Sequence, residues 1–271
     1  MIWVNAVTSD MTHDGALAQP MLTDSVLLNR ATTLTDAERD RLESAIASVR
    51  TFRAGEIAVH QDTQIHISLL LVDGFMTRHV DARDGKRHLV AVHVPGDFVD
   101  LHAFTLKRLD HDVGALTDVR AAVFTHEALE QIQHDDGELA RRLWFITMLD
   151  AAQHRQWIYR LSSLTALQRV AHFLCETHAR LLAVARSRDH GFSLPMTQSD
   201  IGEVCSLTNV HVNRVLRDLR EMGLCQVRSS QVQILDLDGL VKAALFEPGY
   251  LYLNARVAAE AVGRTGESHD G

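Results

Sequence analysis

The side chains best suited to bind a charged polymer gather in residues 194–235. Here apolar residues recur at positions i, i+3, i+4 and i+7, which predicts a helix with one buried face: Val212, Val215, Leu216 and Leu219. At about 100° per residue, the opposite face carries Val210, Asn213, Arg214 and Arg217, with Asn209 and His211 at the helix start. Such side chains can bind base edges and phosphates while the apolar face holds the helix in place. The pattern predicts a recognition helix for double-stranded DNA.

The flanking residues predict how this helix is positioned. Thr197 with Asp200 forms a capping-box pattern, which predicts a first helix over residues 198–205, and Thr208 is suited to cap the second. Gly223 ends that helix, and two β-type runs, residues 224–227 and 232–235, surround Arg228. Together these features predict a winged helix-turn-helix. From spacing alone, an ordinary helical hairpin followed by a β-hairpin stays an open alternative.

Each predicted contact residue has an expected role. Arg214 is expected to bind a base edge or a phosphate, Arg217 and Arg228 to bind phosphates, and Val210 to pack on a thymine methyl group. The polar contacts with an open target are Asn209, His211 and Asn213, and the helix starts complete the predicted DNA-binding set with Thr197, Gln198 and Thr208. For every one of these residues, a solvated surface position is the alternative.

The distribution of charge supports this localisation. The 271 residues carry a net charge of -8, which argues against a surface that attracts nucleic acid everywhere. Residues 160–235, however, contain 9 arginines and 6 acidic residues, a net +3, whereas the remainder has 18 basic and 29 acidic residues, a net -11. The positive charge therefore lies where phosphate contacts need it.

The N-terminal half reads as β structure. Short runs rich in Val, Ile, Leu, Phe and Thr, including residues 65–72, 75–80, 87–94 and 120–125, alternate with glycine turns. They predict an antiparallel β-roll of about eight strands. Before it, a capping pattern at Thr35 and Glu38 predicts a short opening helix that includes Leu42, Ala45 and Ile46.

A long helix is expected between the two halves. Residues 143–152 are apolar almost all round, so this helix must be covered on more than one side. The same helix of a second subunit is the expected cover, and a core helix of one larger domain is the alternative. Ser162-Ser163 is the expected hinge. The predicted division is a flexible N-terminal extension 1–30, a β-roll sensor domain 31–137, a dimerisation helix 138–161, a DNA-binding domain 162–240 and a C-terminal extension 241–271.

These motifs resemble the Crp/Fnr superfamily of bacterial transcription regulators over roughly residues 35–240. The resemblance rests on Gly55-Glu56, Asp73-Gly74, Pro95-Gly96-Asp97-Phe98, Leu194-Pro-Met-Thr-Gln-Ser-Asp-Ile-Gly and Val212-Asn-Arg-Val-Leu-Arg-Asp-Leu-Arg. It implies an α+β fold with a cyclic-nucleotide-binding-like jelly roll, a homodimer and a palindromic operator, with RNA polymerase as a candidate partner. Many members carry Arg-Glu, or Glu alone, where this chain has Asn209 and Val210, so its half-site is expected to differ.

The same resemblance places an effector pocket in the β-roll. The matching residues are Asp97, Asp100, Leu101, His102, His111 and Asp112. Leu101 stands near the family's ribose-binding Glu, and His111-Asp112 stand near its phosphate-binding Arg-Ser. Because a carboxylate repels a phosphate in a pocket of low dielectric constant, cyclic AMP is disfavoured and the effector stays unknown. No cysteine precedes Cys175, which disfavours the N-terminal iron-sulfur cluster of some relatives.

Other classes are less well supported. No cofactor, metal or catalytic residue is expected, although the abundant histidines leave metal or haem open. A cupin-like metal enzyme is an alternative suggested by His93 and His102, but it leaves the basic helix-turn-helix unexplained. A β-roll that acts only as a ligand-free interaction module is a second alternative. The lack of an apolar run near the roughly 18 residues of a membrane span predicts no membrane association and a cytoplasmic location.

Overall fold

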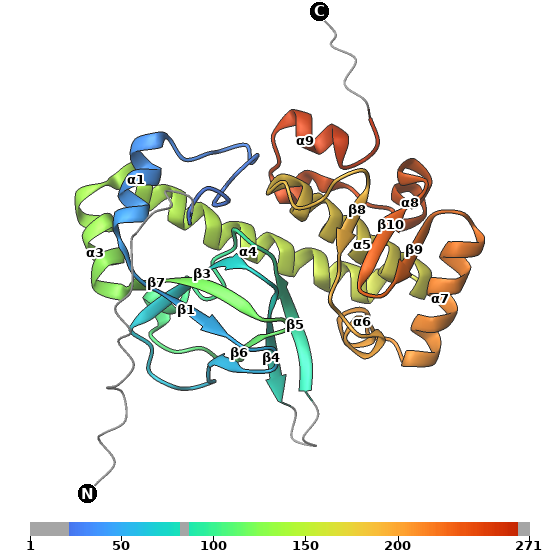
Figure 1. The fold of residues 1–271 in the computed structure, drawn as a ribbon, viewed down its shortest axis with the longest axis horizontal. Coiled ribbons are helices and arrows are strands. Elements are labelled where there is room, and N and C mark those ends of the chain that lie inside the picture. The colour runs from blue at the N-terminus through green and yellow to red at the C-terminus, as the bar shows by residue number, and fades with distance from the viewer. Residues whose placement is uncertain (1–21, 82–86, 265–271) are drawn as a thin grey trace, which may run out of the picture.

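The computed structural model describes residues 22–81 and 87–264. A β-roll and a helical winged-helix domain lie side by side, and the long helix α4 (Gly137–Ser163) runs along both (Figure 1). No helix in these residues has the length and apolarity needed to cross a membrane.

The β-roll consists of two antiparallel sheets, with strand orders β1-β7-β3 and β2-β6-β4-β5. Alternate residues of β3 pack on opposite faces, since Leu69 and Leu71 enter a cluster between the sheets while Leu70 and Val72 enter a cluster under the helices. This double burial explains the continuous apolar run that predicted the strand. The strands are β1 (Ile46–Phe52), β2 (Ile57–Val59), β3 (Ile67–Asp73), β4 (Met76–Asp81), β5 (Arg87–His93), β6 (Asp112–Ala115) and β7 (Val119–Thr125).

Helices cover the outer face of the first sheet. The predicted capping box of Thr35 and Glu38 begins α1 (Asp36–Ser44), but the helix ends before Ala45, and Ile46 begins β1. The expectation that Ala45 and Ile46 are helical was wrong because pairing of Ile46 with Phe124 outweighs the local pattern. The short helix α2 (Ala103–Leu106) follows β5, and α3 (His126–Asp135) joins β7 to α4.

One face of α4 is buried and another apolar face is exposed. Leu139, Leu143 and Ile146 pack against the β-roll. The exposed residues of the second face are Trp144 (67% exposed), Met148 (49%), Ile158 (69%) and Tyr159 (44%).

The winged-helix domain is built around α5 (Ala166–Ala183), which is buried over most of its length. Its sheet has the order β8-β10-β9. The remaining elements are β8 (Gly191–Ser193), α6 (Gln198–Cys205), α7 (Asn209–Glu221), β9 (Cys225–Arg228), β10 (Gln231–Ile234), α8 (Leu237–Ala244), the 3-10 helix η1 (Pro248–Leu251) and α9 (Ala255–Glu260).

Both predicted extensions need correction. Residues 22–30 are packed rather than flexible: Val26 and Leu27 are buried, and Arg30 donates to the carbonyl oxygen of Leu251 over 2.6 Å. At the other end, residues 241–264 belong to the winged-helix core, where Leu251 and Val257 are buried. Both contacts were missed because their partners lie far away in the sequence. Residues 1–21 and 265–271 of the predicted extensions lie outside the described residues.

Candidate DNA-binding surface

The turn between α6 and α7 sets their relative position. Thr197 and Asp200 form the predicted capping box, in which Thr197 Oγ1 accepts from Asp200 N over 3.1 Å and Asp200 Oδ2 accepts from Thr197 N over 2.8 Å. At Gly202 the turn approaches α6 so closely that an added Cβ would lie 2.6 Å from the carbonyl oxygen of Leu207. Glycine at this position therefore allows the two helices to pack.

The buried face of α7 is the predicted one. Val212, Val215 and Leu219 are buried, and Leu216 packs partly buried against the same core. Thr208 caps the helix, its Oγ1 accepting from His211 N over 3.4 Å. The apolar spacing therefore determined which side of α7 is left for solvent.

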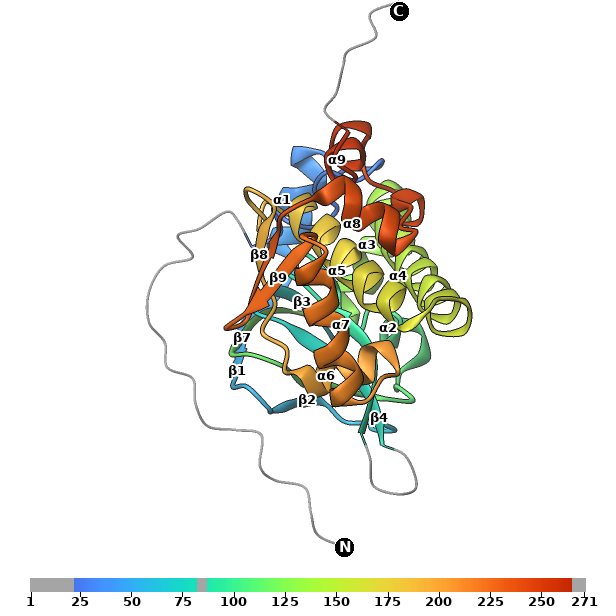
Figure 2. The same ribbon diagram turned by 90° about the vertical axis from the view of Figure 1, so that its right-hand side faces the viewer.

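All ten predicted DNA-binding residues are exposed: Thr197, Gln198, Thr208, Asn209, Val210, His211, Asn213, Arg214, Arg217 and Arg228. Figure 2 shows α7 toward the viewer, with β9 beside it and α6 near its lower end. The two-residue turn at Ser229 and Ser230, both with positive φ, is the tip of the wing, directly after Arg228. The structure thus brings helix and wing residues to one side of the domain.

The arginines of this surface differ in their partners. Arg217 lies 3.7 Å from Asp218 and 3.8 Å from Glu221, between guanidinium nitrogen and carboxylate oxygen. Arg214, by contrast, forms no ion pair with any residue that the structure describes. Its guanidinium can therefore bind a base edge or phosphate without first breaking a protein contact.

The predicted effector residues make separate contacts within the protein, and their role in binding an effector stays a prediction. Asp97 Oδ2 accepts from Arg180 over 2.5 Å and from Val94 N over 3.0 Å, so this carboxylate is already bound. Burial alone would raise the pKa of Asp97, but the Arg180 guanidinium holds it well below its usual range. Asp112, at another place in the sheet, accepts from Gln61 N over 2.6 Å.

The other predicted effector residues are also largely enclosed. Asp100 Oδ1 accepts from Leu69 N over 2.6 Å, and burial raises the pKa of Asp100 to about 7. The rings of His102 and His111 lie 5.5 Å apart, and burial, followed by the charge of Arg78, lowers the pKa of both. Within the described residues, no group of three or more His, Cys, Asp or Glu is arranged to hold a metal ion.

Two known domain families match the chain. The Crp-like helix-turn-helix domain matches residues 168–243, and the cyclic nucleotide-binding domain matches residues 49–136. The transcriptional activator protein FnrL of Cereibacter sphaeroides is 26% identical over 215 residues, which cover 77% of this chain and 85% of that protein. The anaerobic regulatory protein of Haemophilus influenzae is 22% identical over 210 residues, covering 78% and 81%.

One solved structure is similar to this chain in both sequence and fold. FixK2 from Bradyrhizobium japonicum superposes with a TM-score of 0.67 at 26% identity, covering 73% of this chain and 97% of that one. The chain belongs to the Crp/Fnr superfamily. It is a DNA-binding transcription regulator of the Crp/Fnr type.

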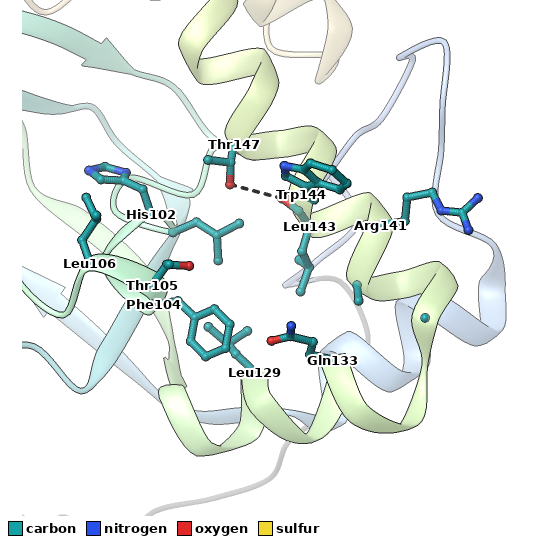
Figure 3. Close-up of a pocket in the computed structure, with 13 residues that line it drawn as sticks. His102, Phe104, Thr105, Leu106, Leu129, Gln133, Arg141, Leu143, Trp144 and Thr147 are labelled. Atoms are coloured by element: carbon teal, nitrogen blue, oxygen red, sulfur yellow. Dashed lines mark hydrogen bonds between the residues drawn. The ribbon is translucent and has the colours of Figure 1, made fainter.

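One cavity of this Crp/Fnr regulator overlaps the predicted effector set only in part. It has a volume of about 660 Å³ and lies between α2, α3 and α4 (Figure 3). Its walls are mostly apolar, with Phe104, Leu129 and Trp144 among them, and only Leu101 and His102 of the six predicted effector residues line it. The lining also includes one guanidinium group, that of Arg141.

Two features of the regulator escaped prediction. The third strand of the wing sheet, β8, is only three residues long, and its best signal was Phe192 between small residues. The contacts of Asp97 with Arg180 and of Arg87 with Asp200 had no signal in the sequence, because their partners are 83 and 113 residues apart.

Proposed function

We propose that the protein binds a palindromic operator as a homodimer, with one α7 in each of two successive major grooves. The observation that carries this proposal is the exposed, mostly polar face of α7 beside the wing, on a helix whose other face is buried. The half-site centres would lie about 34 Å apart, one turn of B-DNA.

Each contact residue has a proposed role. Arg214 binds a base edge or a phosphate, and Arg217 and Arg228 bind phosphates on either side. Val210, 79% exposed at the start of α7, packs on a thymine methyl group. Asn209, His211 and Asn213 supply further polar contacts, and Thr197, Gln198 and Thr208 lie at helix N-termini, where backbone N–H groups favour phosphate.

The second face of α4 is the proposed dimer contact. Met148 and Tyr159 are separated by 11 residues, about three turns at 3.6 residues per turn, so they lie on the same side of the helix. Four exposed apolar side chains along one helix would be covered by the same helix of a second copy about a two-fold axis.

The signal is proposed to act at the β-roll, and cyclic AMP is not proposed as that signal. Asp97 is engaged by Arg180, and the space beside Pro95, Gly96 and Asp97 amounts to only about 20 Å³, room for a water molecule. Isothermal titration calorimetry with cyclic AMP checks this, and saturable binding would contradict it. The proposed location is the cytoplasm, and RNA polymerase is the proposed protein partner.

Selection from random DNA tests the function. The full-length protein would be incubated with a pool of duplexes carrying about 30 random base pairs, enough for two half-sites one turn apart. The expected product is an inverted repeat, protected in two symmetric patches. A single unrepeated site would contradict the dimeric reading, and no enrichment would contradict operator recognition altogether.

A further inference from the structure

Strand β5 occupies a special place in the β-roll. It is the edge strand of the sheet β2-β6-β4-β5, so only one of its sides pairs with another strand. Beyond it lies α6 of the winged-helix domain, against which β5 packs (Figure 1). The winged-helix domain therefore covers an edge that would otherwise be open to other chains.

Apolar packing is continuous across this boundary. Leu89 and Val92 of β5 are buried in the same cluster as Ile201 and Val204 of α6. Val94, just after the strand, is part of that cluster as well. The two domains therefore share one hydrophobic core through β5, which a free rotation about Ser162-Ser163 would break.

An ion pair holds the first end of β5. Arg87 Nη2 lies 2.9 Å from Asp200 Oδ1 and 3.7 Å from Glu203 Oε1, both on α6. The other carboxylate oxygen of Asp200 accepts the capping-box bonds of Thr197. One carboxylate thus begins the helix-turn-helix and also ties it to the β-roll.

A second ion pair holds the turn after β5. Asp97 binds Arg180 of α5 over 2.5 Å, and Arg180 also lies 3.7 Å from Glu176 on its own helix. Arg180 is 4% exposed, so this pair is shielded from solvent, unlike Arg87 with its side chain 43% exposed. The two pairs contact two different helices of the winged-helix domain, which resists rotation better than one contact can.

We propose that β5 and its following turn position the winged-helix domain for DNA binding, with Arg87 and Asp97 as positioning residues. The domain reads DNA while docked on β5, and the exposed face of α7 is already free in this arrangement. The inference rests on the proposed operator reading by α7, and it places a fixed docking where Ser162-Ser163 was expected to act as a hinge.

Charge reversal at Arg87 tests the proposal. Arg87→Glu places a carboxylate beside Asp200 and Glu203 and should lower affinity for the selected duplex about tenfold, because the like charges repel and destabilise the docked arrangement. The matched control is Arg120→Glu, the same change at an exposed arginine of β7. Gel-shift titrations of the full-length protein at several salt concentrations measure both.

The salt dependence separates positioning from direct contact. A positioning residue gives the same slope of log K against log salt as Arg120→Glu, whereas loss of a phosphate contact reduces the slope by about 0.9. A reduced slope, an unchanged affinity or a raised affinity for Arg87→Glu would each overturn the proposal.

Rescue supplies a second readout. Combining Arg87→Glu with Glu203→Lys recreates an opposite-charge pair and should recover most of the lost affinity, while Arg120→Glu with Glu203→Lys should show only additive effects. Additivity in the first pair would contradict the proposal.

Arg214→Ala is measured in parallel to separate the two proposals. Normal binding by Arg214→Ala would contradict operator reading by α7. Loss of binding by Arg214→Ala together with normal binding by Arg87→Glu would contradict only the positioning by β5.

Discussion

The DNA-facing side of α7 and the interior of the β-roll use charged side chains in opposite ways. On α7 they project into solvent, where Arg214 is free to meet DNA. In the β-roll, Arg78 is 2% exposed and binds Asp150 of α4 over 2.7 Å, and Asp97 binds Arg180. Motif residues on the exposed face of an amphipathic helix therefore stay available for a ligand. Charged residues at a domain boundary can instead form ion pairs within the protein.

The largest expected effect follows from removing the free arginine. Arg214→Ala should lower affinity for the selected operator about 100-fold, near the upper range for a bidentate base contact, and abolish the specific shift. A gel-shift titration at fixed salt measures it, with Arg120→Ala as the control for loss of an exposed arginine. Unchanged affinity would show that Arg214 does not contact DNA. It would also contradict the proposed difference between the exposed charges of α7 and the paired charges of the β-roll.

A smaller effect is expected where α7 is held on α6. Gly202→Ala places a Cβ 2.6 Å from the Leu207 carbonyl oxygen and should lower the free energy of unfolding by about 2 kcal/mol. Gly137→Ala is the matched control, because nothing lies within 4 Å of its added Cβ. Urea unfolding followed by circular dichroism compares the two variants. Equal free energies of unfolding would show that the turn at Leu207 shifts to accommodate the added Cβ at little cost.

The buried groups of the β-roll should make stability depend on pH. Burial, followed by the charge of Arg78, lowers the pKa of His93 to about 4 from 6.5. Between these two pH values His93 is protonated in the unfolded chain but not in the folded protein. The free energy of unfolding therefore falls as the pH drops from 6.5 toward 4. Between pH 6 and 5, wild type should lose about 1 kcal/mol more than His93→Gln in urea unfolding.

Asp100 provides a control of opposite sign. Its pKa is raised to about 7, so the folded protein holds a proton that the unfolded carboxyl has released, and stability from this group grows as the pH falls from 7 toward 4. Asp100→Asn should therefore steepen the acid loss that His93→Gln reduces. Parallel curves for all three proteins would show that these buried groups do not titrate on unfolding.

The smallest expected effect concerns the wing. Arg228→Ala should weaken operator binding several-fold and reduce the slope of log K against log salt by about 0.9, the share of one phosphate contact. Fluorescence anisotropy across a salt series measures the slope. A weaker affinity with an unchanged slope would assign Arg228 to the shape of the wing instead.

Much of the DNA-binding surface was predictable from local pattern. The first helix of the motif begins at Gln198 and ends at Cys205, as predicted, because the capping box and the left-handed Ser206 are local features. The strand β8 was missed because three residues carry too little pattern. The packing of segments 22–30 and 241–264 was missed because their contact partners are remote in the sequence.

By itself, the sequence determined that α7 presents Arg214 outward, since the spacing of Val212, Val215 and Leu219 leaves that side no other choice. It also determined the caps that begin α1, α6 and α7, at Thr35, Thr197 and Thr208. Only the tertiary structure decided that Asp97 serves Arg180 rather than a ligand, and that Arg87 ties β5 to α6. The physical reason is the sequence separation of the interacting residues. Helix faces follow from residues three or four positions apart, whereas a buried charge pairs with whichever residue folding brings within hydrogen-bond distance.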